Sequence, residues 1–168
     1  MRYLLDANVF ITAKNLHYGF DFCPAFWDWL LLAHENGTVF SIEKVHDELM
    51  VQDDELTGWA EACEDSFFIQ PDEKTLKAMG KVSAWVQKQP YTPAAKNTFF
   101  QKADYYLIAQ ALAGQFAVVT HERPAATVNK VKIPDVCIAL KLRVVTPFEM
   151  LRIERARFVL RSGSSGNT

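Results

Sequence analysis

Short apolar runs alternate along the chain with longer segments in which hydrophobic residues recur every three or four positions. The apolar runs predict strands at residues 2–5, 38–40, 66–70, 116–120 and 142–146. The intervening segments predict helices over residues 24–37, 41–51, 55–64, 72–88, 99–113, 135–140 and 147–160. Strands separated by helices predict an α/β fold, in which a central parallel sheet is flanked by helices.

Several of these boundaries rest on residues that favour helix ends or loops. Ser41 and Asp72 are predicted N-caps, because their side-chain oxygens can accept the free N–H groups of a first helical turn. Pro147 suits the first turn of the last helix, since a proline lacks the N–H group that would be left free there. Segment 89–98 contains two prolines and is predicted to be a loop.

Length and composition predict a single globular domain. The chain has 168 residues, of which 49% are hydrophobic and 23% charged, as in ordinary globular proteins. We expect one domain over residues 1–160 and a disordered tail over 161–168, which is rich in Ser and Gly. The apolar runs are too short to span a membrane, and the start lacks the pattern of a secretory signal. Three widely spaced cysteines are expected to be reduced thiols, so we predict a cytoplasmic protein.

The net charge of −2 conceals a strong separation of charge along the chain. Residues 1–73 carry 15 acids and three Lys or Arg, whereas residues 74–168 carry 15 Lys or Arg and five acids. Two solvated faces that attract each other would explain this separation. A basic surface for a polyanion, beside an acidic half with a different role, would explain it equally well.

A carboxylate directly follows the first predicted strand. In YLLDANVF, Asp6 comes after three apolar residues, and ligands bind beyond the carboxyl ends of the strands in parallel α/β sheets. A carboxylate at the end of a buried strand is unfavourable unless a partner compensates for its charge. The candidate explanations are a helix N-cap, a salt bridge and a metal ion.

Four further acids stand at unusual positions. Glu48 lies at the edge of the hydrophobic stripe of its helix, and Asp104 lies in the first half of helix 99–113. Glu122 follows the apolar run FAVVT by two residues, and Asp135 stands where a helix begins. Taken singly, each has an ordinary explanation: a surface or salt-bridge role for Glu48 and Asp104, a loop position for Glu122 and a helix cap for Asp135.

Together, these acids predict a site for a divalent cation. Asp6 and Glu122 follow apolar strands of one parallel sheet, while Glu48 and Asp104 lie on flanking helices, so all four can converge at one edge. Clustered carboxylates repel one another unless protons or a hard cation compensate for their charge. Mg²⁺ and Mn²⁺ prefer oxygen ligands, and we therefore expect Mg²⁺ or Mn²⁺ as the cofactor.

The segments LLDANVF, VHDEL, KADYYLIAQAL and VVTHE resemble the four-acid signature of PIN-domain ribonucleases, over about residues 1–150. Within that family the chain is most similar to the VapC-type toxins of bacterial toxin–antitoxin pairs. The resemblance implies a single PIN-like (Rossmann-like) domain that cleaves RNA with the help of a divalent metal. It implies that the catalytic and metal-binding acids are Asp6, Glu48, Asp104 and Glu122.

The resemblance also implies supporting residues and contains one departure. Asn8 and Thr120 resemble the polar residues that support the acids. The family more often has Asp or Asn in a T-x-D pattern where this chain has Glu122. Because glutamate is one methylene longer, either Glu122 or Asp135 is the expected fourth acid.

An RNA substrate would give the basic half of the chain a purpose. The predicted RNA-binding residues are Lys77, Lys81, Lys88 and Lys102, which fall in a stretch without acids. They are expected to attract the phosphate backbone of a transfer, messenger or ribosomal RNA with an exposed loop. Three aromatic residues in or beside the 89–98 segment are candidates either for stacking on bases or for the core: Tyr91, Phe99 and Phe100.

Partners and alternatives follow from the same residues. A toxin would need a separate antitoxin protein, which is expected to place an Arg or Lys among the acids. The aromatic helix 24–36 is either a homodimer surface or core. Two other functions stay open: a non-catalytic PIN-like module that binds RNA or protein, and a phosphatase of the haloacid-dehalogenase type. The phosphatases usually have an acid or Thr at the position of Asn8.

Overall fold

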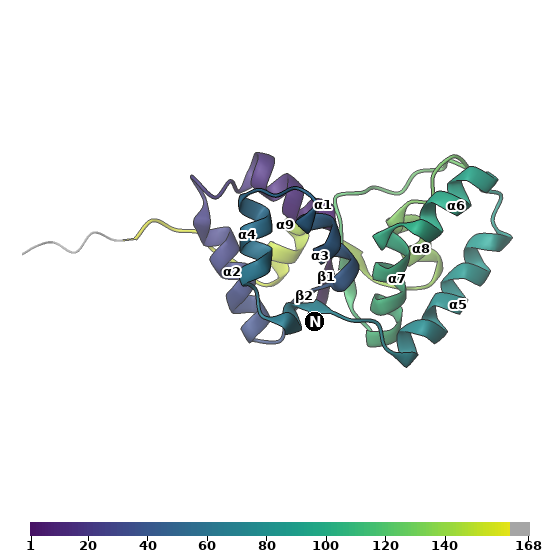
Figure 1. The fold of residues 1–168 in the computed structure, drawn as a ribbon, viewed down its shortest axis with the longest axis horizontal. Coiled ribbons are helices and arrows are strands. Elements are labelled where there is room, and N and C mark those ends of the chain that lie inside the picture. Colours follow the sequence, from purple (N-terminus) through teal and green to yellow (C-terminus); the bar gives the residue numbers. More distant parts are fainter. Residues whose placement is uncertain (162–168) are drawn as a thin grey trace, which may run out of the picture.

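A five-stranded parallel sheet forms the centre of the computed structural model, which describes residues 1–161 (Figure 1). The strands are short: β1 Tyr3–Leu5, β2 Val39–Ile42, β3 Phe68–Ile69, β4 Ala117–Val119 and β5 Val144–Val145. Their order is β3-β2-β1-β4-β5, and every neighbouring pair is parallel. The predicted α/β fold with a parallel sheet is thus confirmed, and its winding is Rossmann-like. The predicted tail lies outside the described residues, except for Arg161.

Helices cover both faces of this sheet. Residues 1–161 contain nine α-helices: α1 Ala7–Thr12, α2 Pro24–Glu35, α3 Glu43–Met50, α4 Glu55–Ala62, α5 Glu73–Lys88, α6 Pro93–Gln101, α7 Ala103–Gly114, α8 Ile133–Ala139 and α9 Pro147–Ile153. In Figure 1, α2, α4 and α9 lie on one side of the strands and α5 to α8 on the other. Helix α5 packs along α7 and forms an outer layer. None of the described helices is long and apolar enough to cross a membrane.

The direction in which the chain winds reverses beside the first strand. From β1 the chain moves outward to β2 and β3, then returns across the sheet to β4 on the other side of β1, and ends at β5. The carboxyl ends of β1 and β4 therefore form the topological switch point, where parallel α/β sheets open a crevice for ligands.

The core is built on the central strands and on the aromatic helix α2. All three residues of β1 are fully buried, because helices cover both faces of the sheet. Phe26, Trp27 and Leu30 of α2 are also buried, and the Phe20 ring stacks on Trp27 at a centroid distance of 4.1 Å. The aromatic stripe proposed either as a homodimer surface or as core is therefore core.

The predicted loop at 89–98 is correct only for residues 89–92, and the prediction of one continuous helix over 99–113 was wrong. Helix α6 begins at Pro93, and the Thr92 hydroxyl accepts a hydrogen bond from the Ala95 N–H at 3.1 Å. Proline at the first helical position is compatible with a helix because its missing N–H would be free there in any case. The chain then breaks at Lys102, whose backbone is extended, and α7 begins at Ala103.

Three further boundaries differ from prediction. Helix α1 and a π-helical turn at Ala13–His17 were not predicted. Ser41 is not a cap, because its hydroxyl donates to the Leu5 carbonyl at 2.6 Å and ties β2 to β1. The last helix ends at Ile153 instead of residue 160, and Arg155 takes a left-handed backbone with φ of 55°. The Asp72 and Pro147 predictions were correct, with Asp72 forming a capping box with Thr75.

Candidate active site at the carboxyl edge of the sheet

Asp6 occupies the switch point with its carboxylate buried. It directly follows β1, and its side chain is only 4% exposed. The Asp6 N–H donates to the Val119 carbonyl of β4 at 3.0 Å, which continues the ladder between the two strands. The Thr120 hydroxyl donates to Asp6 Oδ2 at 2.9 Å. The ends of both strands thus hold this carboxylate in one orientation.

The structure excludes two of the three explanations for a carboxylate at this place. Asp6 stands at the N-cap position of α1, but its side chain makes no capping hydrogen bond. The ion pairs among residues 1–161 are Lys14–Asp54 and Lys130–Glu122, so Asp6 is not in a salt bridge. Its buried negative charge is compensated neither as a cap nor as an ion pair.

Asp104 reaches the same edge of the sheet from the flanking helix α7. It is the second residue of α7, directly after the break at Lys102, and it is half-buried. The first turn of a helix stabilises a negative charge because the free N–H groups point toward it. The break between α6 and α7 therefore gives Asp104 a more favourable position than the interior of a long helix would.

Glu48 approaches from α3. Val45 and Leu49 of this helix are fully buried, as is Ile42 before it, whereas Glu48 is solvent-exposed at the edge of that stripe. Helix α3 also contacts α7. Glu48 therefore lies at the rim of the site and Asp6 at its base.

Glu122 is held by the start of α8. Its Oε2 accepts a hydrogen bond from the Ile133 N–H at 2.8 Å, and its Oε1 lies 3.6 Å from Lys130 Nζ. Its own N–H donates to the Thr120 hydroxyl at 3.1 Å. Thr120 therefore bonds both to Asp6 and to the backbone of Glu122.

The four acids act on one another electrostatically. Burial raises the pKa of Asp6 to about 7, with further increases from Asp104, Glu122 and Glu48, while the Thr120 hydrogen bond opposes the rise. Burial and then the Glu122 charge raise the pKa of Asp104, against the lowering effect of Lys102 and Lys130. Burial and then Asp104 raise the pKa of Glu48. The sheet edge thus gathers four negative charges that favour binding of protons or cations.

The donor atoms suit a hard divalent cation, although they do not form a closed cage. Within residues 1–161, no three Asp, Glu, His or Cys side chains lie close enough together to hold one metal ion among them. Mg²⁺ keeps several of its waters and is commonly held by one or two carboxylates. A buried aspartate whose pKa is raised by a second carboxylate supplies the oxygen donors that such an ion prefers. Asp6 and Asp104 are the residues that would hold it.

The contacts that hold Asp6 and Glu122 involve neither Asn8 nor Asp135. Asn8 is exposed on α1. Asp135 is not the helix cap, because it stands within the first turn of α8, and its Oδ2 accepts from the Ala125 N–H at 3.3 Å. Its charge raises the pKa of Tyr91, after burial, rather than that of the other acids. Of the two candidates for the fourth acid, Glu122 is the one whose charge acts on Asp6 and Asp104.

The predicted RNA-binding lysines separate into two groups. Lys77, Lys81 and Lys88 are exposed on the outer helix α5. Lys102, in contrast, lies near the acids and lowers the pKa of Asp104 and of Glu48. Sequence analysis missed Lys130, which pairs with Glu122. Its position could have indicated this contact, because Lys130 lies in the loop between β4 and α8, which begins at the switch point.

The aromatic residues proposed for stacking belong mainly to the core. Phe99 is 2% exposed, while Tyr91 and Phe100 are half-buried. The Phe99 ring lies 5.6 Å from both Phe100 and Tyr105. This cluster packs α6 onto α7.

Comparison with known proteins identifies a family but no activity. The sequence model of the family described as "Domain of unknown function (DUF4411)" matches residues 3–158. The match includes the whole sheet and all four acids. No curated protein matches the chain.

The raised pKa of Asp6 predicts how stability depends on pH in the absence of metal. The unfolded chain loses the Asp6 proton near pH 3.8, whereas the folded chain keeps it until about pH 7. Between these values the folded state binds more protons, so this group lowers the free energy of unfolding as pH rises, by up to ~1.4 kcal/mol per pH unit. Asp6→Asn removes this effect.

The measurement is urea unfolding in EDTA at several values between pH 4.5 and 7.5. The free energy of unfolding of Asp6→Asn should increase relative to wild type across this range. The control is Asp47→Asn, which alters an exposed acid of α3 and should show a constant difference. A constant difference for Asp6→Asn as well would contradict the burial argument.

Proposed function

The chain belongs to the DUF4411 family, and we propose that it is a divalent-metal-dependent endoribonuclease. The observation that carries this proposal is the buried Asp6 carboxylate at the switch point, whose pKa is raised by burial and by the charges of Asp104, Glu122 and Glu48. Within residues 1–161, neither a cap nor an ion pair compensates for the charge of Asp6, and a divalent cation would do so where the carboxylate has lost its proton. The resemblance of the segments around these acids to PIN-domain ribonucleases supports the same reaction.

Each acid has a proposed role. Asp6 and Asp104 would hold the principal ion, Glu122 would orient the attacking water, and Glu48 at the rim would recruit a second ion. When bound, Mg²⁺ or Mn²⁺ lowers the pKa of a water molecule and stabilises negative charge on the phosphate. Thr120 keeps Asp6 in a fixed orientation through its hydrogen bond, which makes it a positioning residue.

Lys102 and Lys130 attract the substrate. Both lie near enough to lower the pKa of Asp104, so a phosphate group that approaches the acids also meets two positive charges. Without them, the negative charges of RNA and of the site would repel each other. An exposed single-stranded loop is the proposed target, because unpaired bases are accessible where those of an A-form helix are not.

The first test is cleavage of RNA. Purified protein should cut total RNA with Mg²⁺ or Mn²⁺ and not with EDTA. Asp6→Asn and Asp104→Asn should each lower the rate by roughly 100-fold or more, because they remove ligands, whereas Thr120→Val should lower it about tenfold. The exposed Asp47→Asn variant is the control and should retain the wild-type rate. Wild-type rates for both Asp6→Asn and Asp104→Asn would refute the proposal.

The second test concerns the path of the RNA. Replacement of Lys77, Lys81 and Lys88 together by Gln should weaken binding and reduce the slope of log K against log salt by about 2, because three phosphate contacts would be lost. In the comparison variant, Gln replaces three arginines near the end of α9: Arg152, Arg155 and Arg157. If only this second variant reduces the slope, the RNA lies across α9 instead of α5.

The proposed setting is that of a cytoplasmic toxin controlled by a separate antitoxin. The pairing of Lys130 with Glu122 illustrates how a cationic side chain engages these acids. A partner that places an Arg or Lys between Asp6 and Asp104 would compete with the cation, because charge-assisted hydrogen bonds to carboxylates are strong. A slowly released inhibitor also needs a buried apolar anchor.

The third test is growth of a bacterial host. Expression of the wild-type chain alone should arrest growth, and co-expression of the adjacent small gene should restore it. The Asp104→Asn variant, expressed to the same level, should not arrest growth. Normal growth with soluble wild-type protein and no antitoxin would leave a nuclease without a toxin role.

A non-catalytic RNA-binding module is the second candidate. One observation favours it: Glu122 is already engaged by the Ile133 N–H and by Lys130, so it is not free to complete a metal site as it stands. The cleavage assay separates the two functions, since a binding module would retain RNA without cutting it at any metal concentration.

A further inference from the structure

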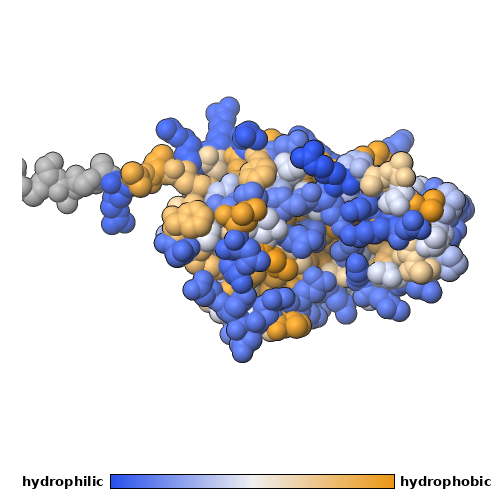
Figure 2. All heavy atoms as spheres, turned by 90° about the horizontal axis from the view of Figure 1, so that it is seen from above, coloured by the Kyte–Doolittle hydropathy of each residue, from blue (hydrophilic) through white to orange (hydrophobic). Residues whose placement is uncertain are grey.

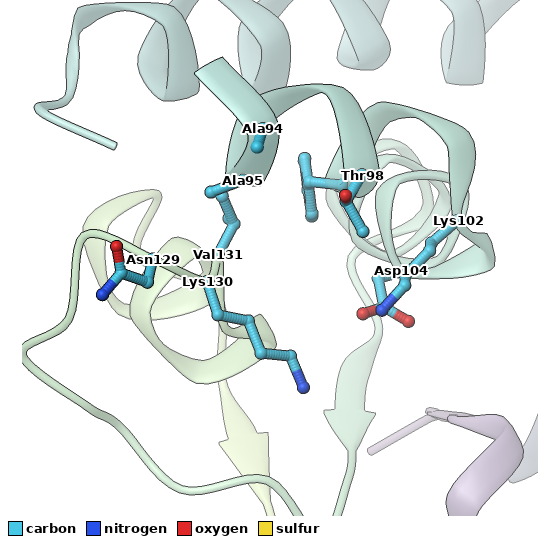
Figure 3. Close-up of a pocket in the computed structure, with 9 residues that line it drawn as sticks. Ala94, Ala95, Thr98, Lys102, Asp104, Asn129, Lys130 and Val131 are labelled. Atoms are coloured by element: carbon cyan, nitrogen blue, oxygen red, sulfur yellow. The ribbon is translucent and has the colours of Figure 1, made fainter. Parts of the chain in front are cut away.

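A cavity of about 250 Å³ opens beside Asp104. It lies between α6, the start of α7 and the loop that precedes α8, and Figure 3 shows its walls. Lys102 and Asp104 stand on one wall, with Asn129, Lys130 and Val131 on the opposite one. Ala94, Ala95 and Thr98 of α6 line the part away from the sheet. The cavity therefore adjoins the site while extending beyond the acids.

Its two ends differ in chemistry. One end is apolar, with Ala95, Phe99 and Val131 as buried walls. The other end carries the ammonium groups of Lys102 and Lys130, which face the region around the Asp104 carboxylate (Figure 3). Thr98 and Asn129, both exposed, add hydrogen-bonding groups to the lining. A ligand that fits this arrangement has a flat or apolar part joined to an anionic part.

We propose that this cavity binds a single unpaired nucleotide of the RNA, adjacent to the bond that is cut. The base enters the apolar end between α6 and residues 129–131, and its phosphate lies between Lys102 and Lys130, beside Asp104. This inference rests on the proposed ribonuclease function and adds to it a determinant of substrate choice. Thr98 and Asn129 would distinguish one base from another by hydrogen bonds to the base edge.

Size and position support a nucleotide over other anions. The volume lies just below the ~300–1,000 Å³ typical of pockets for drug-sized ligands, so the cavity suits one base rather than a longer segment. A free phosphate would use the two lysines and leave the apolar end unfilled. A base from a duplex would first have to leave its stack, at a cost of a few kcal/mol, whereas an unpaired base avoids this cost.

The test is binding of the four ribonucleoside 5′-monophosphates, with inorganic phosphate as the comparison ligand. These nucleotides contain no phosphodiester bond, so binding can be followed by NMR titration in Mg²⁺ without turnover. At least one nucleotide should bind about tenfold more tightly than inorganic phosphate, a difference of ~1.4 kcal/mol. Ala94→Leu, which fills the cavity from an exposed position on α6, should abolish that difference. Lys130→Gln should weaken the binding of both nucleotide and phosphate.

Two matched control variants keep the test specific. Ala139→Leu and Lys141→Gln make the same changes at exposed positions at the end of α8 and just after it, toward the start of β5. Both should bind like wild type. If nucleotides bind no better than phosphate, or if Ala94→Leu binds like wild type, the assignment of the cavity is overturned.

A cleavage experiment separates this inference from the proposed function. On an RNA with a randomised single-stranded loop, Ala94→Leu should lose the preference for the base next to the cut, while its cleavage still requires Mg²⁺ or Mn²⁺. If this variant retains the wild-type base preference, the cavity proposal is wrong and the ribonuclease proposal stands. If wild type cuts no RNA, the ribonuclease proposal fails, and the nucleotide titration alone decides whether the cavity binds a nucleotide.

Discussion

The burial of one carboxylate at the reversal point of the sheet is the constraint on which the rest of the site depends. Asp6 lies at the end of a strand that is buried on both faces, where an unpaired negative charge is unfavourable. The surrounding structure addresses this charge only in part. Thr120 donates one hydrogen bond, while the other acids raise the pKa of Asp6 further. The site therefore has an affinity for positive charge before any ligand arrives, and protons and metal ions compete for it.

The arrangement of helices determines which groups meet Asp6. The break at Lys102 ends α6 and starts α7, so Asp104 stands in a first helical turn next to a lysine. The start of α8 brings the Ile133 N–H to Glu122, and the loop before it brings Lys130. Lysines thus lie close to the acids at this edge of the sheet. Groups of both signs are what a site for both a cation and a phosphate would require.

The sequence predicted much of this architecture because the relevant signals are local. Continuous apolar runs identified all five strands, and Asp72 and Pro147 marked helix starts correctly. The break between α6 and α7 was missed because two prolines favour a loop and a helix start almost equally. The sequence could not show whether Glu122 or Asp135 acts on Asp6. That depends on how the loop after β4 folds back against the start of α8, where Glu122 accepts from Ile133 and Asp135 accepts from Ala125. Lys130 was missed because its contact with Glu122 closes a loop that carries no regular pattern.

Glu122 belongs both to the start of α8 and to the group of acids, so a movement of its side chain would affect both. Its carboxylate caps the first turn of α8 and also contributes to the charge around Asp6 and Asp104. If Glu122 rotated toward a bound cation, the Ile133 N–H would lose its acceptor and the first turn of α8 would loosen. Cation binding and the order of this turn would then be thermodynamically linked, each weakening the other. Amide hydrogen exchange at Ile133 would report, from outside the acidic cluster, whether the cation is bound.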